Sequence, residues 1–81
     1  MKYSIRHYPS SEQPFQVEED HWEMQWEPEV WVVTMQKEQD SDDQLMKDII
    51  SYYRNNGVWA ISNMIYFYKE SDLTFFSLRW S

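Results

Sequence analysis

Apolar residues recur at helical spacing within residues 41–57, and this stretch divides the chain into two dissimilar halves. Intervals of three and four residues separate most of its apolar side chains, which places them on one stripe of an α-helix. Polar and charged residues occupy most of the intervening positions and can face water. The stretch therefore predicts an amphipathic helix whose apolar stripe is formed by Leu45, Met46, Ile49, Ile50, Tyr52 and Tyr53.

Both ends of this predicted helix have residues that typically start or end a helix. Ser41 followed by Gln44 fits a capping box, in which the two side chains satisfy backbone N–H groups of the first turn. Asp42 and Asp43 place negative charge where the helix dipole favours it. Gly57 can adopt the left-handed conformation that commonly ends a helix.

On the N-terminal side of the helix, apolar and polar residues alternate, as they do in half-buried strands. Residues 2–8 predict a first strand, and residues 30–35 predict a strand rich in β-branched side chains. Between them, residues 21–27 predict a strand with two tryptophans and a methionine on one face. Residues 12–20 are mostly polar, and we expect a loop or a short edge strand there.

After the helix the period of two returns. We expect residues 58–68 and 73–80 to form an antiparallel hairpin, with turn residues at 69–72. On one face of its first strand we expect Trp59, Ile61, Ile65 and Phe67, and on one side of its second strand Phe76, Leu78 and Trp80.

The order of these elements predicts the α+β class. We expect a single domain, residues 1–81, with a small antiparallel β-sheet of four or five strands in the order β-β-β-α-β-β. One amphipathic helix is expected to pack on one face of this sheet. Aromatic residues make up 19% of the chain, and their large area helps so short a chain to form a stable core.

Composition also limits where the chain is expected to work. Cys is absent, and because small secreted domains often depend on disulfides, we expect a reducing, cytoplasmic location. The first ten residues lack the apolar stretch of a signal peptide. No apolar run approaches the ~18 residues that a membrane-spanning helix requires.

The formal net charge of −7 is unevenly distributed. Residues 1–11 have a balance of +2, residues 12–43 a balance of −10, and residues 44–81 a balance of +1. Because phosphate groups and anionic lipids require a cationic surface, we expect no direct binding of nucleic acid and no binding to a membrane.

Candidate catalytic and metal-binding groups are sparse. His7 and His21 are the only histidines, and neither has a convincing nucleophile beside it in sequence. On a strand, His21 and Glu23 would share a face about 6.6 Å apart, but no zinc-type or EF-hand spacing accompanies them. A single glycine, Gly57, excludes a glycine-rich phosphate loop. We therefore expect neither an enzyme nor a bound metal or cofactor.

Residues 12–29 combine seven acids with no base, and tryptophans lie within and beside this segment. In one interpretation the segment is a solvated polar face whose tryptophans all point into the core. In the other it is a docking surface, on which the acids steer a basic partner and an exposed tryptophan anchors it. The candidate partner-binding residues are Glu18, Glu19, Asp20, Trp22, Glu23, Trp26, Glu27 and Glu29, together with Asp40, Asp42 and Asp43 at the helix start. Among them, we expect Glu19, Glu23 and Glu27 to share one side of the molecule with the three aspartates of the helix start.

In size and charge the chain resembles small acidic inhibitors made by phages, including nucleic-acid mimics and anti-CRISPR proteins. This resemblance implies a protein that inhibits or modulates a basic, nucleic-acid-handling partner protein. The same features would suit an immunity protein that neutralises a basic toxin. A module that grips a peptide or small molecule with exposed aromatic side chains is a further alternative. Salt separates these classes, because only a charge-driven complex weakens steeply as ionic strength rises.

Overall fold

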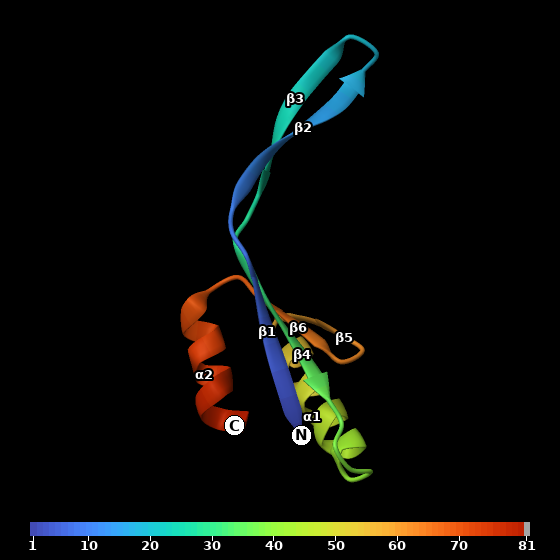
Figure 1. Ribbon diagram of the computed structural model, residues 1–81, viewed down its shortest axis with the longest axis vertical. Helices are drawn as coiled ribbons and strands as arrows, with labels where there is room; N and C mark the ends of the chain where they lie inside the picture. Colours follow the sequence, from blue (N-terminus) through green and yellow to red (C-terminus); the bar gives the residue numbers. More distant parts are fainter. Residues whose placement is uncertain (81) are drawn as a thin grey trace.

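The computed structural model describes residues 1–80, whose helices and strands follow the order β-β-β-β-α-β-β-α (Figure 1). The strands are β1 (Lys2–Tyr8), β2 (Ser11–Glu18), β3 (His21–Glu27), β4 (Val30–Gln36), β5 (Trp59–Ile61) and β6 (Met64–Phe67), and the helices are α1 (Asp42–Asn55) and α2 (Glu70–Trp80). β2 and β3 form a two-stranded sheet, and the other strands form a four-stranded antiparallel sheet in the order β1-β4-β6-β5. The α+β class and the antiparallel sheet with a helix on one face are confirmed.

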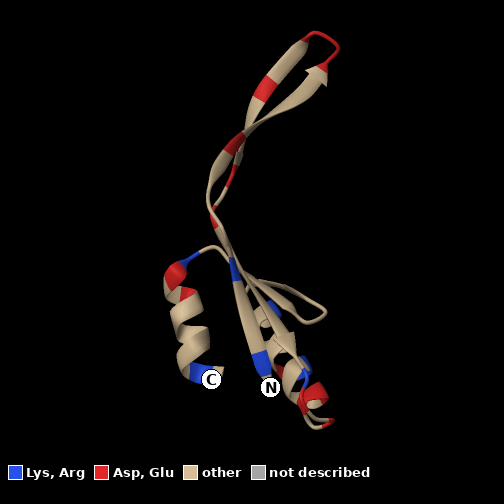
Figure 2. Cartoon of the chain, viewed as in Figure 1, with Lys and Arg blue, Asp and Glu red and all other residues tan. Residues whose placement is uncertain are grey.

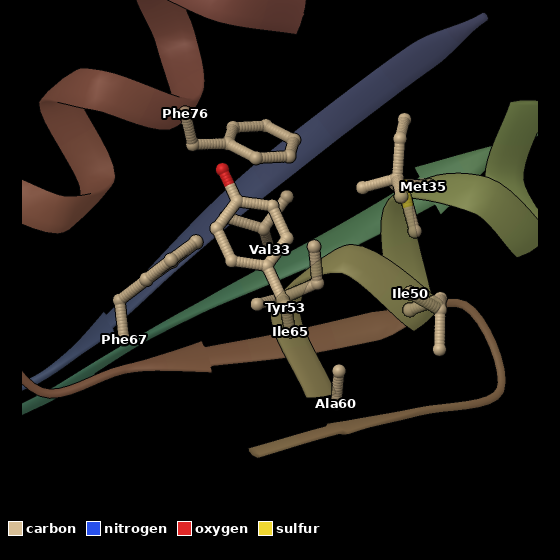
Figure 3. Packing of buried hydrophobic residues seen from close by; sticks show 9 residues of the cluster. Val33, Met35, Ile50, Tyr53, Ala60, Ile65, Phe67 and Phe76 are labelled. Atoms are coloured by element: carbon tan, nitrogen blue, oxygen red, sulfur yellow. The ribbon is translucent and has the colours of Figure 1, made fainter. Parts of the chain in front are cut away.

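Both helices pack on one face of the four-stranded sheet. The rings of Tyr53 in α1 and Phe76 in α2 lie 6.0 Å apart, and both pack against Phe67 of β6. Trp80 of α2 donates a hydrogen bond from Nε1 to the hydroxyl of Tyr53 at 3.2 Å. Figure 3 shows Tyr53, Phe67 and Phe76 from close by, together with the other buried apolar residues. The buried apolar core consists of Val33, Met35, Ile49, Ile50, Tyr53, Ala60, Ile65, Phe67 and Phe76.

The four N-terminal strands form one continuous ribbon. β1 pairs with β4 as far as Tyr8 opposite Val30, and β2 pairs with β3 from Ser11 opposite Glu27 onward. Two residues intervene on each side, so the register is unchanged across the break. Pro9 and Pro28 lie in this joint, and since proline has no N–H to donate to the ladder, they account for the interruption.

Beyond the joint, the ribbon projects away from the body of the molecule (Figure 1). The molecule is therefore 54 Å long but only 23 by 22 Å in its other two directions. We call residues 11–29 the arm; they comprise β2, its turn, β3 and the joint residues of the second strand. Of the two alternatives expected for residues 12–20, the loop is wrong and a strand is present, but β2 is eight residues long rather than short.

The predicted hairpin between residues 58–68 and 73–80 is wrong. Residues 58–68 contain both strands of a shorter hairpin, β5 and β6, joined by a turn at Ser62 and Asn63. The turn shifts the alternation, so that Ala60, Ile65 and Phe67 face the core while Trp59 and Ile61 face away from it.

The last segment is the helix α2 rather than a strand. Leu73, Phe76 and Trp80 are spaced as on one side of a helix, and all three pack in or against the core. Leu78, which the strand prediction grouped with Phe76 and Trp80, is instead exposed. Thr74 donates a hydrogen bond from its hydroxyl to the carbonyl of Glu70 at 3.1 Å in the first turn.

Helix α1 lies where the periodicity predicts, but details of its ends and stripe differ. The predicted capping box is absent, because Ser41 makes no side-chain cap hydrogen bond and Gln44 donates instead to Asp48 at 2.8 Å. Gly57 has a φ of 77°, which confirms the left-handed residue after the helix. Of the predicted stripe, Ile49, Ile50 and Tyr53 are buried and Met46 is partly buried, whereas Leu45 and Tyr52 are exposed.

Shortening a core side chain of α1 tests this packing. Ile49 is fully buried against the sheet, so Ile49→Ala is expected to destabilise the fold by roughly 2–5 kcal/mol through lost burial and the cavity left behind. Leu45→Ala is the matched control, because Leu45 is 37% exposed, and it should cost less. Chemical denaturation of both variants measures the difference, and an unchanged midpoint for Ile49→Ala would rule out the packing.

Candidate functional site

The arm contains the entire net charge of the protein. Half of the 14 acidic residues lie within residues 11–29, where no lysine or arginine occurs. The other seven acids are balanced by the seven lysines and arginines, all of which lie outside the arm. Figure 2 shows acidic segments along the arm with no basic one among them, while both kinds occur in the body. A projecting element with a charge of −7 on a neutral body produces a strongly directional field.

Pairing of β2 with β3 gives the arm one face rich in large apolar side chains. Trp22, Met24 and Trp26 lie on this face, opposite Gln16, Pro14 and Glu12 of β2. We call these six residues the tryptophan face. The exposed fractions are 60% for Trp22, 59% for Met24 and 61% for Trp26, so the interpretation in which the tryptophans all point into the core is wrong.

The opposite face of the arm is acidic. Glu23 and Glu27 project from β3 on this side, opposite Phe15 and Ser11 of β2. At the tip, Glu19 and Asp20 form the turn, and the side-chain amide of Gln16 donates to the carbonyl of Glu19 at 3.0 Å. The arm thus offers Glu23 and Glu27 beside Phe15 on one face, further acids at its tip, and the larger apolar area together with Glu12 on the other face.

No helix supports the arm. All residues of β3 are exposed, and so are all residues of β2 except Ser11. An isolated two-stranded hairpin is marginally stable in water, and large exposed apolar side chains grouped on one face mark an interaction site. Both the shape and the surface of the arm are therefore typical of an element that is covered in a complex.

The root of the arm is held by polar and aromatic contacts. His7 donates from Nε2 to Glu29 Oε2 at 2.9 Å, and its ring stacks on Trp31 with the two centroids 4.9 Å apart. These contacts connect the joint to the sheet that supports it. Nearer the tip, His21 donates from Nε2 to Glu23 Oε1 at 3.2 Å. Residues 1–80 bring together no group of three or more side chains of the kind that hold a metal ion.

The predicted partner-binding residues divide into two groups. Eight of them lie in the arm, namely Glu18, Glu19, Asp20, Trp22, Glu23, Trp26, Glu27 and Glu29. Asp40, Asp42 and Asp43 lie at the start of α1, at the opposite end of the molecule from the tip of the arm (Figure 2). The expectation that both groups share one side is therefore wrong, because β4 leads the chain away from the arm before α1 begins.

One of these residues, Asp42, is buried and has structural contacts. Its Oδ2 accepts hydrogen bonds from the backbone N–H groups of Glu38 at 2.8 Å and Gln39 at 3.3 Å. The N-terminal ammonium lies 3.3 Å from the same oxygen and 3.0 Å from Glu38 Oε1. The hydrogen bond from Glu38, then the nearby ammonium, hold the pKa of Asp42 below its usual value against the opposing effect of burial.

A groove that sequence analysis missed lies between the two helices. Tyr52 of α1 and Phe75, Leu78 and Arg79 of α2 contribute to its walls. Phe75 and Leu78 are 69% and 75% exposed, and the guanidinium carbon of Arg79 lies 4.5 Å from the centroid of the Tyr52 ring. The interpretation of residues 73–80 as a strand concealed this groove, since only a helix places Phe75 and Leu78 together on its outer side.

Comparison with known proteins finds no matching family model, no similar curated protein and no similar solved structure. Within residues 1–80, neither helix has the length and apolar character needed to cross a membrane.

The exposure of the arm's tryptophans predicts that they contribute little to folding. Trp22→Ser combined with Trp26→Ser is expected to change the free energy of unfolding of the body by less than about 0.5 kcal/mol. Trp31→Ser is the matched control and should be clearly more destabilising, because Trp31 packs against the core. Denaturation followed by circular dichroism measures both, and equal losses would contradict an arm that is free of the core.

The contacts of Asp42 predict a pH dependence of stability. Because the pKa of Asp42 is lowered on folding, its contribution is present above the usual Asp pKa of about 3.9 and is lost as pH falls through the folded value. The hydrogen bond to Glu38 raises the pKa of the N-terminal ammonium, so that contribution is present below about pH 8 and is lost as pH rises through the folded value.

Asp42→Asn is therefore expected to lower the unfolding temperature most between these limits and to flatten its pH dependence at both ends. Asp43→Asn is the control, because the carboxylate of Asp43 is exposed and pairs with Lys37 at 3.3 Å. Thermal unfolding measured across the pH range decides the matter, and parallel curves for the wild type and Asp42→Asn would contradict the assignment.

Proposed function

We propose that this chain is a small acidic binding protein whose arm docks on a basic partner protein and thereby inhibits or modulates it. The observation that supports this most is the confinement of the whole net charge of −7 to a projecting hairpin. Because the arm projects from the body, its acidic residues meet the surface of a partner before the body does (Figure 1). Such a field raises association rates and orients the encounter with a cationic surface.

The tryptophan face supplies the second part of this proposal. Charged rims mainly affect association rate and specificity, whereas desolvated aromatic side chains contribute most of the binding free energy. Trp22 and Trp26 lie on one face with Met24 between them, and all three are available for burial. Partner binding would therefore combine steering by the acids with anchoring by the tryptophans.

A nucleic-acid-handling protein is the partner class that the spacing of the charges favours. At ~3.3 Å per residue, the eight residues of β2 span about 26 Å. Seven acids, counted on both strands together, over this length and the two joint residues give about one charge per 5 Å, compared with ~3.4 Å per phosphate of one DNA strand. This count already includes the acids of both strands, and Asp40, Asp42 and Asp43 add no second acidic row beside it, because they lie at the other end of the molecule (Figure 2).

Two alternatives remain proposals. An immunity protein that neutralises a basic toxin would use the arm in the same way. A peptide- or ligand-binding module is favoured by a different observation, the aromatic groove between α1 and α2 with Tyr52, Phe75 and Arg79 in its walls. Ionic strength and location distinguish binding in this groove from binding at the arm. Binding in the groove would depend neither on the arm nor strongly on ionic strength.

We also propose that the chain is not an enzyme and works in the cytoplasm. The absence of cysteine and the lack of a nucleophile–base pair in the sequence support these two proposals. Direct contact with nucleic acid or with an anionic membrane is disfavoured by the charge of the arm.

Reversing charges on the arm tests the proposed function. Glu23→Lys combined with Glu27→Lys is expected to slow association and to weaken partner binding by up to several kcal/mol. The fold should survive, because both positions are exposed and such substitutions usually change stability by less than about 0.5 kcal/mol each. The measurement is capture of partner proteins by the immobilised chain at low and high salt, followed by identification of the captured protein.

Asp40→Lys combined with Asp43→Lys is the matched control, with the same change in charge at the other end of the molecule. It should retain capture, and the captured protein should lose binding to nucleic acid when the wild-type chain is added. Equal capture by the wild type and the arm variant at low salt, with both shown to be folded, would mean that the arm is only a solvated surface.

A further inference from the structure

The four-stranded sheet has a second face that neither helix covers. Across this face, Arg6, Val32, Tyr66 and Trp59 form one row through β1, β4, β6 and β5. A hollow of about 400 Å³ lies beside this row. We call this surface the open sheet face; it consists of Lys2, Ser4, Arg6, Tyr8, Val30, Val32, Thr34, Gln36, Trp59, Ile61, Met64 and Tyr66.

The open sheet face and the arm have opposite charges and similar apolar character. Lys2 and Arg6 are the only charged residues of the open sheet face, and both are basic. Neither forms a salt bridge within residues 1–80. The arm has seven acids and no base, and its tryptophan face matches the valines, methionine and aromatic residues of the open sheet face in chemical type. The two surfaces therefore have complementary charges and similar apolar side chains.

We propose that the open sheet face binds the arm of a second copy of this chain, and that two copies exchange arms in a two-fold symmetric dimer. The continuous ribbon makes this arrangement possible. Because the register is unchanged across the joint, even-numbered residues lie on one side of the ribbon from β1 and β4 as far as Gln16 and Trp22, beyond which a β-bulge shifts the register. The open sheet face and the tryptophan face are therefore successive parts of one twisted surface.

Distances along the ribbon support the exchange on the first strand. With the two-fold axis at the joint, residues equally far from it on either side face each other across the dimer. Arg6 precedes Pro9 by three residues and Glu12 follows it by three, which is about 10 Å in each direction. Arg6 of one copy thus lies opposite Glu12 of the other, and Lys2 lies opposite the segment Gln16–Glu18.

The second strand matches in the same way. In the unchanged register Pro9 lies across from Glu29, which is therefore the centre on this strand. Val30 and Val32 follow Glu29 by one and three residues, and Pro28 and Trp26 precede it by one and three. Apolar residues therefore meet apolar residues on this strand, while opposite charges meet on the other. Each copy uses one arm and one open sheet face, so the contact closes on itself and leaves neither surface free for a third copy.

The dimer and the complex proposed with a basic partner both use the tryptophan face, but they depend on different acids of the arm. Glu23 and Glu27 lie on the face of the arm that points away from the dimer contact, whereas Glu12 lies on the tryptophan face that is buried in it. The dimer inference stands without a partner protein, and different residues test the two proposals.

Sedimentation velocity of the full chain over the micromolar range tests the dimer. The wild type should sediment as a dimer of 10.1 kDa subunits at low salt and dissociate as salt is added. Arg6→Glu and Glu12→Arg each place like charges at both symmetric contacts and are expected to raise the dimer dissociation constant by about tenfold or more. Lys47→Glu is the control, because Lys47 lies exposed on α1 away from the contact.

An equimolar mixture of the Arg6→Glu and Glu12→Arg chains provides the decisive measurement. In the mixed dimer one contact joins the two reversed side chains and the other joins the two original ones, so opposite charges meet at both. The mixture is expected to dimerise as well as the wild type although each variant alone does not. A wild type that stays monomeric at low salt, or a mixture no better than its components, would overturn the proposal.

Discussion

The backbone register that pairs β1 with β4 and β2 with β3 determines which side chains of these strands lie on each face. Tyr8 opposite Val30 and Ser11 opposite Glu27 keep one register although they belong to two sheets, and alternation then assigns the side chains of the ribbon to its two faces as far as the β-bulge between Gln16 and Glu18. In the body, helices close one face and create the core around Val33 and Met35. In the arm no helix is available, and both faces remain open. A slip of one residue would expose the core positions of the affected strand, because the period of a strand is two.

Elements with one unambiguous local pattern could be predicted from the sequence, and elements with two compatible patterns could not. β1, β3 and α1 follow alternation or helical spacing alone, and β4 is a short run rich in β-branched residues. In residues 73–80, Leu73, Phe76 and Trp80 fit a helix, yet Phe76, Leu78 and Trp80 alternate as in a strand. Contacts of Phe76 with Tyr3 and Tyr53, residues far away in sequence, select the helix. The phase of β5 and β6 depends on a turn at Ser62 with a φ of 58°, for which no glycine gives a signal.

The candidate site was predictable as a composition but not as a shape. Charge counting identifies the acids of residues 12–29 and adds Asp40, Asp42 and Asp43, because all lie before or at the start of one helix. Position in space depends on β4, whose seven residues carry the chain about 23 Å from the joint in the direction opposite to the arm. Carboxylate side chains therefore have different surroundings at the two ends of the molecule. At the arm it stays in water, and at α1 Asp42 is enclosed by backbone N–H groups and the N-terminal ammonium.

The concentration of acidic residues in the arm also links the pairing of β2 with β3 to the surface that binds the arm. Like charges on β2 and β3 oppose the pairing of two strands that no helix supports, while cross-strand contacts of the tryptophan face favour it. A cationic surface that binds the arm removes part of this repulsion. Because such a surface binds the paired strands more tightly than the frayed strands, it stabilises the paired form by that difference in binding free energy. A basic partner and the Lys2–Arg6 strand of a second copy both meet this requirement. If both bind one arm, each lowers the apparent affinity of the other in proportion to the fraction of arms it occupies, and the concentration of the chain itself then sets how much of it is free to act.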